Sequence, residues 1–590
     1  MPVLDRNQIL PDDELIPQNG DLLSEGREIG QKTTLGTCPF LETYNVRSEI
    51  EYKRQRAAEG TIMLHGQIGY RSLAKSQKAY ARIYEKLIDA GYCVDRYGIC
   101  LDWSMGYPAA QRANMPTGTG LILGKSEDFT ALTRSAPVAP HFGDFVIGTP
   151  AAVENTVAAL EAGSTSIGNL GQFFTFKMPN WSDDVYTTAE TVKAIASCAV
   201  QPVEIMIHSN LDDGFASLFY DMSCGIGAVL LEKYIVEELI GGHVSHCYGH
   251  TYSDPLTRLA FQRALARVTD TPGSMVYGNT TIYVAGEVEN YANLASYLLV
   301  DIVGQKTLPT GHGLNPVPVT EAMHIPEIQE IIDAHLFANR LIQRAEGYEN
   351  LFDMEAADKI AERLVKGGQL FKERVLKGVS EAGIDIKNSF ELLLAMRRIG
   401  AKQLEELYGP GEPRTDYPRK RTPIIRATTI ETLERKSIDL INRLEETIIE
   451  KLQQSGLTVC VACTDVHEYG KILVEEFLRR LGIKVVDAGV SVDPEVVVEE
   501  AKVTRADFIA ISTYSGIALT FLEALRDEMS KKNIDIPVLI GGKLTQIPDD
   551  RQSSSPIDVT DQLKDLGAIV CNDVEDIIDV LTSKIKGQDQ

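Results

Sequence analysis

Three short polar segments near the end of the chain carry residue types that bind ligands, and each follows an apolar run. The first contains Asp465, His467 and Gly470, between the apolar run 457–462 and an amphipathic run 472–481. A histidine beside a carboxylate can act as a metal ligand that the carboxylate orients, and glycine permits close backbone approach. Taken alone, the segment equally allows an ordinary turn with a solvent-facing histidine.

The other two segments make a shared site more probable than a turn. Ser512-Thr513-Tyr514 follows the apolar run 507–511, and Gly541-Gly542 follows the run 537–540. Because the carboxyl ends of parallel strands meet at one edge of a sheet, the three segments should lie together. We expect a planar ligand at this edge, with a tail inserted between strands past Ser512 and the glycines, where larger side chains would block it.

The surrounding residues 455–590 predict the fold that positions these segments. Short apolar runs alternate with amphipathic helical runs, which is typical of a flavodoxin-like, doubly wound parallel sheet. The predicted strands are 457–462, 484–487, 507–511, 537–540 and 568–570.

This pattern resembles the cobalamin-binding domain in which a protein histidine replaces the dimethylbenzimidazole base. The resemblance implies that His467 is the lower axial ligand of cobalt and that Asp465 hydrogen-bonds its other ring nitrogen. It further implies that Ser512 contacts the displaced base and that Gly541 and Gly542 line the tail channel. Tyr514 departs from the family, which often has leucine there. The implied cofactor-binding residues are Asp465, Val466, His467, Gly470, Ser512, Tyr514, Gly541 and Gly542, with His467 on the metal.

Residues 58–345 predict a second, larger domain. Eight steps of strand, polar loop and helix favour a (β/α)8 barrel over an open sheet. We place its strands at 61–65, 92–101, 138–147, 163–168, 202–208, 243–248, 274–278 and 302–308. Five of the ten histidines then fall on loops at the strand carboxyl ends, where barrel enzymes build their sites. These are His65, His141, His208, His250 and His312.

Two segments lie outside these domains. Residues 1–57 are polar and predict an arm on the body of the protein or on a partner subunit. Residues 346–454 predict charged amphipathic helices, interrupted by the proline-rich segment 408–421, and form a helical linker.

Composition limits the partners. The chain has 83 acidic and 58 basic residues and a formal charge of −25, which disfavours nucleic acid and anionic membranes. We find neither a signal peptide nor an apolar run of membrane-spanning length. Nine cysteines suit a reducing compartment, so we expect a cytoplasmic protein, and we expect a homo-oligomer, a dimer or a tetramer.

The barrel segment resembles the catalytic barrel of glutamate mutase around 148–165, at Gly168-Asn169-x-Gly171, around Tyr248-Gly249 and at 316–322. Leu170 and Phe142 replace residues that handle the amino and carboxylate groups of glutamate in that family. A barrel and a cobalamin domain in one chain, without the acid that handles the amine, resemble 2-methyleneglutarate mutase.

These resemblances imply an adenosylcobalamin-dependent radical carbon-skeleton mutase that acts on a small mono- or dicarboxylic acid. An arginine could clamp the carboxylate, and Arg96 is the first candidate, before Arg71 and Arg112. Five polar residues are predicted to hold the substrate and the adenosyl ribose: His65, Gln67, Asn169, Gln172 and His312. Two alternatives remain open, a corrinoid-dependent methyltransferase and a cobalamin-binding regulator.

Overall fold

The computed structural model describes residues 4–250, 254–415, 417–465, 468–548 and 556–588. Its contacts divide the chain into two compact units, one comprising Met1–Met178 and Ser182–Thr428, the other Pro179–Trp181 and Thr429–Gln590. None of the described helices combines the length and the apolar content that crossing a membrane requires.

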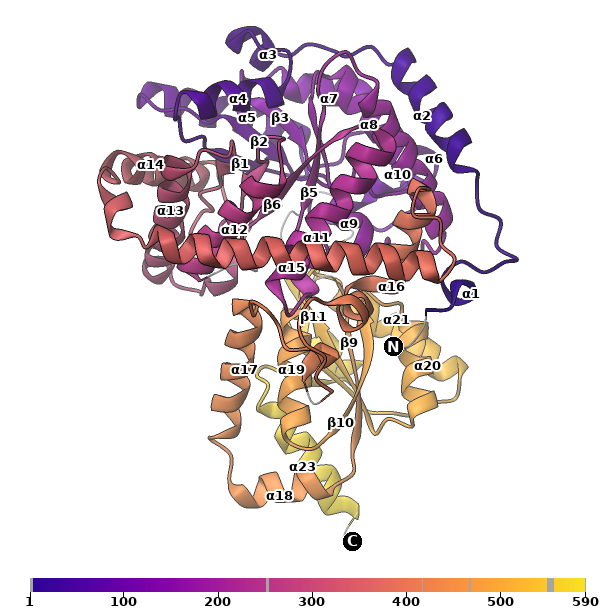
Figure 1. The fold of residues 1–590 in the computed structure, drawn as a ribbon. Helices are drawn as coiled ribbons and strands as arrows, with labels where there is room; N and C mark the ends of the chain where they lie inside the picture. Colours follow the sequence, from indigo (N-terminus) through magenta and orange to yellow (C-terminus); the bar gives the residue numbers. More distant parts are fainter. Residues whose placement is uncertain (1–3, 251–253, 416, 466–467, 549–555, 589–590) are drawn as a thin grey trace. The chain divides into compact units, whose positions relative to one another are not determined.

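The first unit contains eight parallel strands that pair in chain order. A bridge from Leu64 to Leu314 connects the last strand to the first. Several of the strands are labelled in Figure 1, with helices around them. The predicted (β/α)8 barrel is therefore confirmed. Its strands are β1 His65–Ile68, β2 Arg96–Ile99, β3 Ala139–Phe142, β4 Ser166–Gly168, β5 Met206–Asn210, β6 His243–Tyr248, β7 Met275–Val276 and β8 Gly313–Leu314.

Helices surround this barrel and bury its outer face. Their apolar stripes supply much of the large core, with residues such as Ile83 and Leu87 fully buried. The helices are α5 Leu73–Asp89, α6 Ala109–Arg112, α7 Ser126–Thr133, α8 Ala152–Glu161, α9 Leu170–Thr175, α10 Asp184–Ala199, α11 Met222–Lys233, α12 Pro255–Val268, α13 Glu287–Thr307 and α14 Ile328–Arg344.

Two predicted strand positions were wrong. The eighth strand was predicted at 302–308, but these residues belong mainly to α13, and the eighth strand is β8. The first strand was predicted to end at His65, but it begins there. Ile302 and Val303 are buried on the last turns of α13, and so short an apolar stretch does not distinguish a buried helix from a buried strand.

The N-terminal segment packs on the barrel through short helices, α1 Arg6–Ile9, α2 Asn19–Lys32, α3 Pro39–Tyr44 and α4 Glu49–Ala58. Helix α2 contacts α10 so closely that a side chain at Gly26 would collide with the backbone of Lys193. Helix α4 buries Glu49 and Lys53 at the amino-terminal end of the barrel strands.

Beyond the barrel, the long helix α15 Met354–Glu381 packs along α11 and α12, and α16 Ser389–Tyr408 follows it. Arg421 of the proline-rich segment donates to the carbonyls of Glu406, Leu407 and Gly411, so this segment is held against the end of α16.

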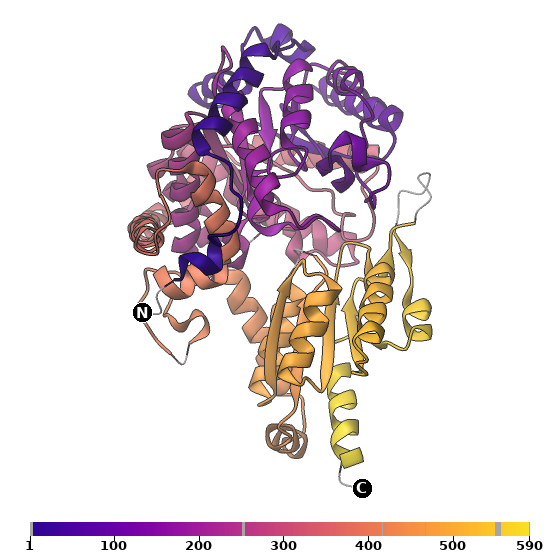
Figure 2. The ribbon, with the colours of Figure 1, turned by 90° about the vertical axis from the view of Figure 1, so that its right-hand side faces the viewer.

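The second unit is a five-stranded parallel sheet of order β10-β9-β11-β12-β15 with helices on both faces (Figure 2). This confirms the predicted flavodoxin-like arrangement. Its main elements are α17 Thr428–Ile441, α18 Glu446–Gln454, β9 Thr458–Cys463, α19 Tyr469–Arg480, β10 Lys484–Val490, α20 Pro494–Thr504, β11 Phe508–Thr513, α21 Ala518–Lys531, β12 Val538–Gly542, β15 Ile569–Cys571 and α23 Asp576–Gln588.

Candidate functional site

The three polar segments lie together at the carboxyl edge of the second sheet, because they stand at the carboxyl ends of β9, β11 and β12. Ser512 pairs with Cys463 on one side and with Gly541 on the other. The N–H of Thr464 donates to the carbonyl of Ser512 at 3.0 Å, which continues the ladder beyond β9. The edge therefore brings residues from three loops into one place.

Asp465 connects two of these loops. Its Oδ2 accepts hydrogen bonds from the backbone N–H groups of Tyr514 and Ser515, both at 3.0 Å, and from the Thr464 hydroxyl at 3.1 Å. The side chain is buried. A charged acceptor makes such bonds stronger than a neutral one, so Asp465 fixes the start of the loop that follows β11.

Val466 and His467 lie outside the described residues. The axial role of His467, and its hydrogen bond with Asp465, therefore remain predictions.

The glycines of this edge allow close backbone approach. A Cβ on Gly542, whose φ is +103°, would lie 2.2 Å from the carbonyl oxygen of Thr513. A Cβ on Gly470 would lie 2.8 Å from Ser512 Oγ, and one on Gly541 would lie 3.0 Å from the carbonyl oxygen of Cys571. Larger residues would push the strand ends apart, which fits the predicted cradle for a ligand tail.

Two further features flank the edge. Lys471, in the first turn of α19, is buried and binds Glu475 and Asp487, both at 2.7 Å, so the helix is fixed to β10. Tyr514 is 46% exposed, and the Lys543 ammonium lies 4.3 Å from its ring centroid. This pair forms an exposed cation–π contact at the position where the resembled family often has leucine.

With this geometry in place, sequence comparison decides the nature of the second unit. Residues 457–560 match the B12 binding domain family. The matched region contains all three loops, and the buried carboxylate and glycines described above fit a cobalamin cradle. The second unit therefore contains a B12-binding domain.

Two similar proteins each match a part of the chain. The chain is 30% identical over 81 residues to the glutamate mutase sigma subunit 1 of Haloarcula marismortui, which is 14% of this chain and 54% of the relative. The chain thus spans about half the length of that curated protein. A solved structure, a novel cobalamin-binding protein from Desulfitobacterium hafniense DCB-2, is 16% identical and has a TM-score of 0.19, over 26% of this chain and 80% of that one.

The interior of the barrel is unusually polar for its class. Strand registers and side-chain alternation place four sets of residues inward, one above another from the amino to the carboxyl end of the strands. These sets are Arg96, Ser166, Ser245 and Gly313; then His65, His141, His208 and Met275; then Gly98, Gly168, Cys247 and Asn315; then Gln67, Gly143, Asn210 and Tyr277.

Glycines make room for the imidazole rings in this interior. A Cβ on Gly313 would lie 2.1 Å from the His65 ring, and one on Gly168 would lie 2.7 Å from the His208 ring. Where many barrels have branched aliphatic residues, this one therefore has histidines packed against glycine backbone.

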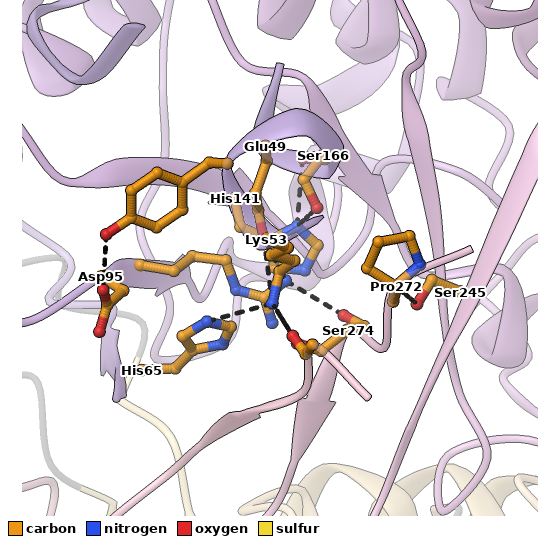
Figure 3. A network of polar contacts seen from close by, with 12 residues as sticks. Glu49, Lys53, His65, Asp95, His141, Ser166, Ser245, Pro272 and Ser274 are labelled. Atoms are coloured by element: carbon orange, nitrogen blue, oxygen red, sulfur yellow. Dashed lines mark hydrogen bonds and ion pairs between the residues drawn. The ribbon is translucent and has the colours of Figure 1, made fainter. Parts of the chain in front are cut away.

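A charged cluster closes the amino-terminal end of the barrel (Figure 3). Arg96 binds Glu49 at 3.2 Å and the hydroxyl of Ser274 at 3.1 Å. Lys53 donates to the carbonyls of Ser274 at 2.8 Å and Gly311 at 3.0 Å, and its Nζ lies 3.4 Å from His65 Nε2. Burial lowers the pKa of Lys53 to about 7, although the neighbouring Glu49 carboxylate opposes this shift.

The predicted substrate-binding residues separate into two groups. Arg96, His65 and His312 lie at the amino-terminal ends of the strands, and all three are buried. Of the five histidines expected on exit loops, His250 does follow its strand, β6, but His65 begins β1, His312 precedes β8, and His141 and His208 lie within strands. Their roles in binding a substrate remain untested predictions.

Gln67, Asn169 and Gln172 lie at the carboxyl end of the barrel. Asn169 and Asn210 both donate to Asp213 Oδ2 at 2.9 Å. Gln172 donates to Asp144 Oδ1 at 3.4 Å. The amides of Asn169, Asn210 and Gln172 therefore bind carboxylates that follow β3 and β5.

Asp144 has altered acid–base behaviour at this end. Burial, together with the nearby charge of Asp213, raises its pKa to about 7. Burial raises the pKa of the Cys100 thiol, and Asp144 and Glu321 add to that effect. A carboxyl group that titrates near neutrality can hold or release a proton under working conditions.

The two other candidate arginines contact backbone. Arg71 donates to the carbonyl of Gly118 at 2.9 and 2.6 Å. Arg112 donates to the carbonyls of Met105, Tyr107 and Leu123, which fixes the loop after β2.

Sequence reasoning missed Glu49, Lys53, Asp144 and Asp213. Asp144 belongs to a loop that the sequence had singled out for His141, so its carboxyl group could have been noticed there. Glu49 and Lys53 form a Glu–Lys pair with helical spacing, which usually indicates a solvated face.

Proposed function

We propose that the protein is an adenosylcobalamin-dependent mutase that rearranges the carbon skeleton of a small mono- or dicarboxylic acid, with 2-methyleneglutarate as the first substrate to test. The observation that carries this proposal is the presence, in one chain, of a B12-binding domain and an eight-stranded barrel with a polar interior. The similarity to a glutamate mutase sigma subunit supports the same reaction class.

In this proposal, the second unit holds the cofactor at the carboxyl edge of its sheet. His467 provides the cobalt ligand, Asp465 holds the adjoining loop, and the glycines at 541 and 542 admit the tail. When bound, adenosylcobalamin supplies a weak cobalt–carbon bond and so gives access to radical chemistry that side chains cannot provide.

The barrel then has the task of holding the substrate and excluding water. Gln67, Asn169 and Gln172 provide neutral donors and acceptors at its carboxyl end, which position a polar substrate without strong acid–base chemistry. Asp144 can hold a proton near neutral pH because its pKa is raised to about 7. An enclosed polar wall limits side reactions of a reactive radical with solvent.

The test is reconstitution of the purified full chain with adenosylcobalamin and a panel of small carboxylic acids. The expected result is a substrate-dependent electron paramagnetic resonance signal of low-spin cobalt(II) coupled to an organic radical, together with an isomeric product in mass spectrometry. Turnover only with methylcobalamin and a methyl acceptor would show a methyltransferase instead. Tight cofactor binding without turnover on any acid would favour a regulator.

A further inference from the structure

Several nitrogen atoms inside the barrel have no hydrogen-bond partner. Among the described residues, this holds for Nε and Nη2 of Arg96, Nδ1 of His65, Nε2 of His141 and Nδ2 of Asn315. All four residues are at most 3% exposed. A buried polar group left unpaired costs on the order of 1–3 kcal/mol, so such a group indicates an occupant that the protein atoms do not supply.

These atoms come from adjoining parts of the barrel wall. His65 pairs with Arg96 across β1 and β2, and His141 follows on β3. Asn315 directly follows β8, where its N–H donates to the carbonyl of Val276 and so extends the ladder. Since Gly313 faces the His65 ring, Asn315, two residues later, faces the same interior.

Most of these nitrogens must be hydrogen-bond donors. A guanidinium has no acceptor, and the amide nitrogen of Asn315 only donates. His65 Nε2 faces the Lys53 amine, a donor, so the ring proton belongs on Nδ1. His141 Nδ1 lies 2.8 Å from the hydroxyl oxygen of Ser166 and 3.1 Å from its carbonyl oxygen, so the role of His141 Nε2 follows from which of the two oxygens Nδ1 bonds.

Two basic side chains, Arg96 and Lys53, lie beside the donors, together with the buried carboxylates of Glu49 and Asp95. Arg96 and Lys53 are opposed by the Glu49 carboxylate, which lies 3.2 Å from Arg96 and 3.7 Å from Lys53. The pKa values of His65, His141 and His208 are all lowered, first by burial and then by the charge of Arg96. Unpaired donors beside the Arg96 guanidinium favour an anion over a water molecule.

We propose that the interior of the barrel binds a small anion, a carboxylate or a halide, through Arg96, His65 and Asn315. The site requires neither cobalamin nor turnover, since all of its residues belong to the barrel unit. Two sources share this chemistry, an inorganic anion held permanently and the carboxylate group of a small organic acid.

The test uses the full chain without cobalamin. Thermal unfolding is measured against increasing sodium bromide and, separately, sodium acetate, with the ionic strength held constant by the sodium salt of a bulky sulfonate. We expect a saturable rise in the unfolding midpoint and, in crystals grown with bromide, an anomalous peak beside the Arg96 guanidinium. Bromide acting alone identifies an inorganic anion as the source, whereas an acetate effect identifies a carboxylate.

Two substitutions at one position sharpen the test without removing the buried arginine. Asn315→Leu should weaken the apparent anion affinity about tenfold or more, since one donor is lost. Asn315→Asp supplies a fixed negative charge and should abolish the dependence on bromide. Asn114→Asp, at an exposed position, makes the same change of charge and should leave the dependence intact.

The proposal is overturned if, at constant ionic strength, neither bromide nor acetate raises the unfolding midpoint of the wild type and no anomalous peak is found. It is equally overturned if Asn315→Leu and Asn315→Asp respond to bromide as the wild type does.

Discussion

Arg258 of α12 and Asp301 of α13 form a bidentate ion pair, with distances of 2.6 and 2.7 Å, among fully buried surroundings. The same guanidinium donates to the carbonyl of Gly249 at 2.6 Å and to that of Tyr277 at 2.7 Å. One side chain therefore joins two outer helices to the loops that leave β6 and β7. The pair raises the pKa of Arg258, in spite of its burial, so the charge persists at all working pH values.

We predict that Arg258→Lys destabilises the barrel by about 3 kcal/mol, because a lysine cannot make the bidentate contact and both loop carbonyls together. Denaturant unfolding with the full chain measures the loss. Arg263→Lys is the matched control on the same helix, since Arg263 binds the partly exposed Asp358 and should cost less than about 1 kcal/mol. Equal effects of the two substitutions would contradict the role given to Arg258.

A second prediction concerns Asp465. Asp465→Ala leaves the N–H groups of Tyr514 and Ser515 without their acceptor, so we expect the affinity for cobalamin to fall about tenfold or more. Spectrophotometric titration with hydroxocobalamin measures it. In the control Asp507→Ala, a carboxylate that accepts from Thr458 N–H is removed at the opposite edge of the same sheet. Only the first variant should lose affinity.

A third prediction concerns Gly542. Alanine there must accommodate a φ of +103° and a contact of 2.2 Å with the Thr513 carbonyl oxygen, so we expect a loss of about 2 kcal/mol or more in stability and weaker cobalamin binding. Calorimetry and cobalamin titration report the two effects. Gly456→Ala is a suitable comparison, since its φ is +66° but nothing lies within 4 Å of the added Cβ. Normal cobalamin affinity in Gly542→Ala would show that the close approach of β11 and β12 at this position is not needed for cobalamin binding.

A fourth prediction is a pH dependence of stability. The folded pKa of Asp144, about 7, exceeds its ordinary value of 3.8, so the folded protein keeps a proton that the unfolded chain releases. The stabilising contribution of Asp144 is therefore complete below its unfolded pKa and is lost as the pH rises toward 7. Relative to wild type, Asp144→Asn should gain stability over that interval, by at most about 1.4 kcal/mol per pH unit.

The comparison for Asp144 is Asp358→Asn. A hydrogen bond from Arg263 lowers the pKa of Asp358, so its titration lies below the ordinary range and should leave the interval from about pH 5 to 7 unaffected. A difference between Asp144→Asn and wild type that stays constant with pH would show that Asp144 is ionised throughout.

The B12-binding domain illustrates what sequence can predict well. Its strands, such as Thr458–Cys463 and Phe508–Thr513, are continuous apolar runs, and each predicted strand lies within a few residues of the observed one. Strands buried on both faces give this signal because every side chain must be apolar. The two glycines that end β12 also marked the edge correctly, since Gly542 adopts a φ that favours glycine.

The barrel interior shows where prediction failed. The number of steps was predicted correctly, but whether a histidine precedes or follows its strand depends on a shift of a few residues, as at His65 and His312. The closure of the barrel by Glu49 and Lys53 depends on tertiary packing, which local spacing does not reveal. Glu49 is buried because it pairs with Arg96, and Lys53 is buried because it donates to the carbonyl of Ser274. Both partners are distant in the sequence.

The chain passes from its barrel unit to its B12-binding unit across the peptide bond between Thr428 and Thr429. The two units are therefore synthesised in equal numbers, and dilution of the protein does not separate them. Covalent linkage of this kind replaces a bimolecular association with an effective concentration on the order of millimolar. Loading of the cofactor domain should then scale directly with the number of barrels, whatever the expression level of the protein.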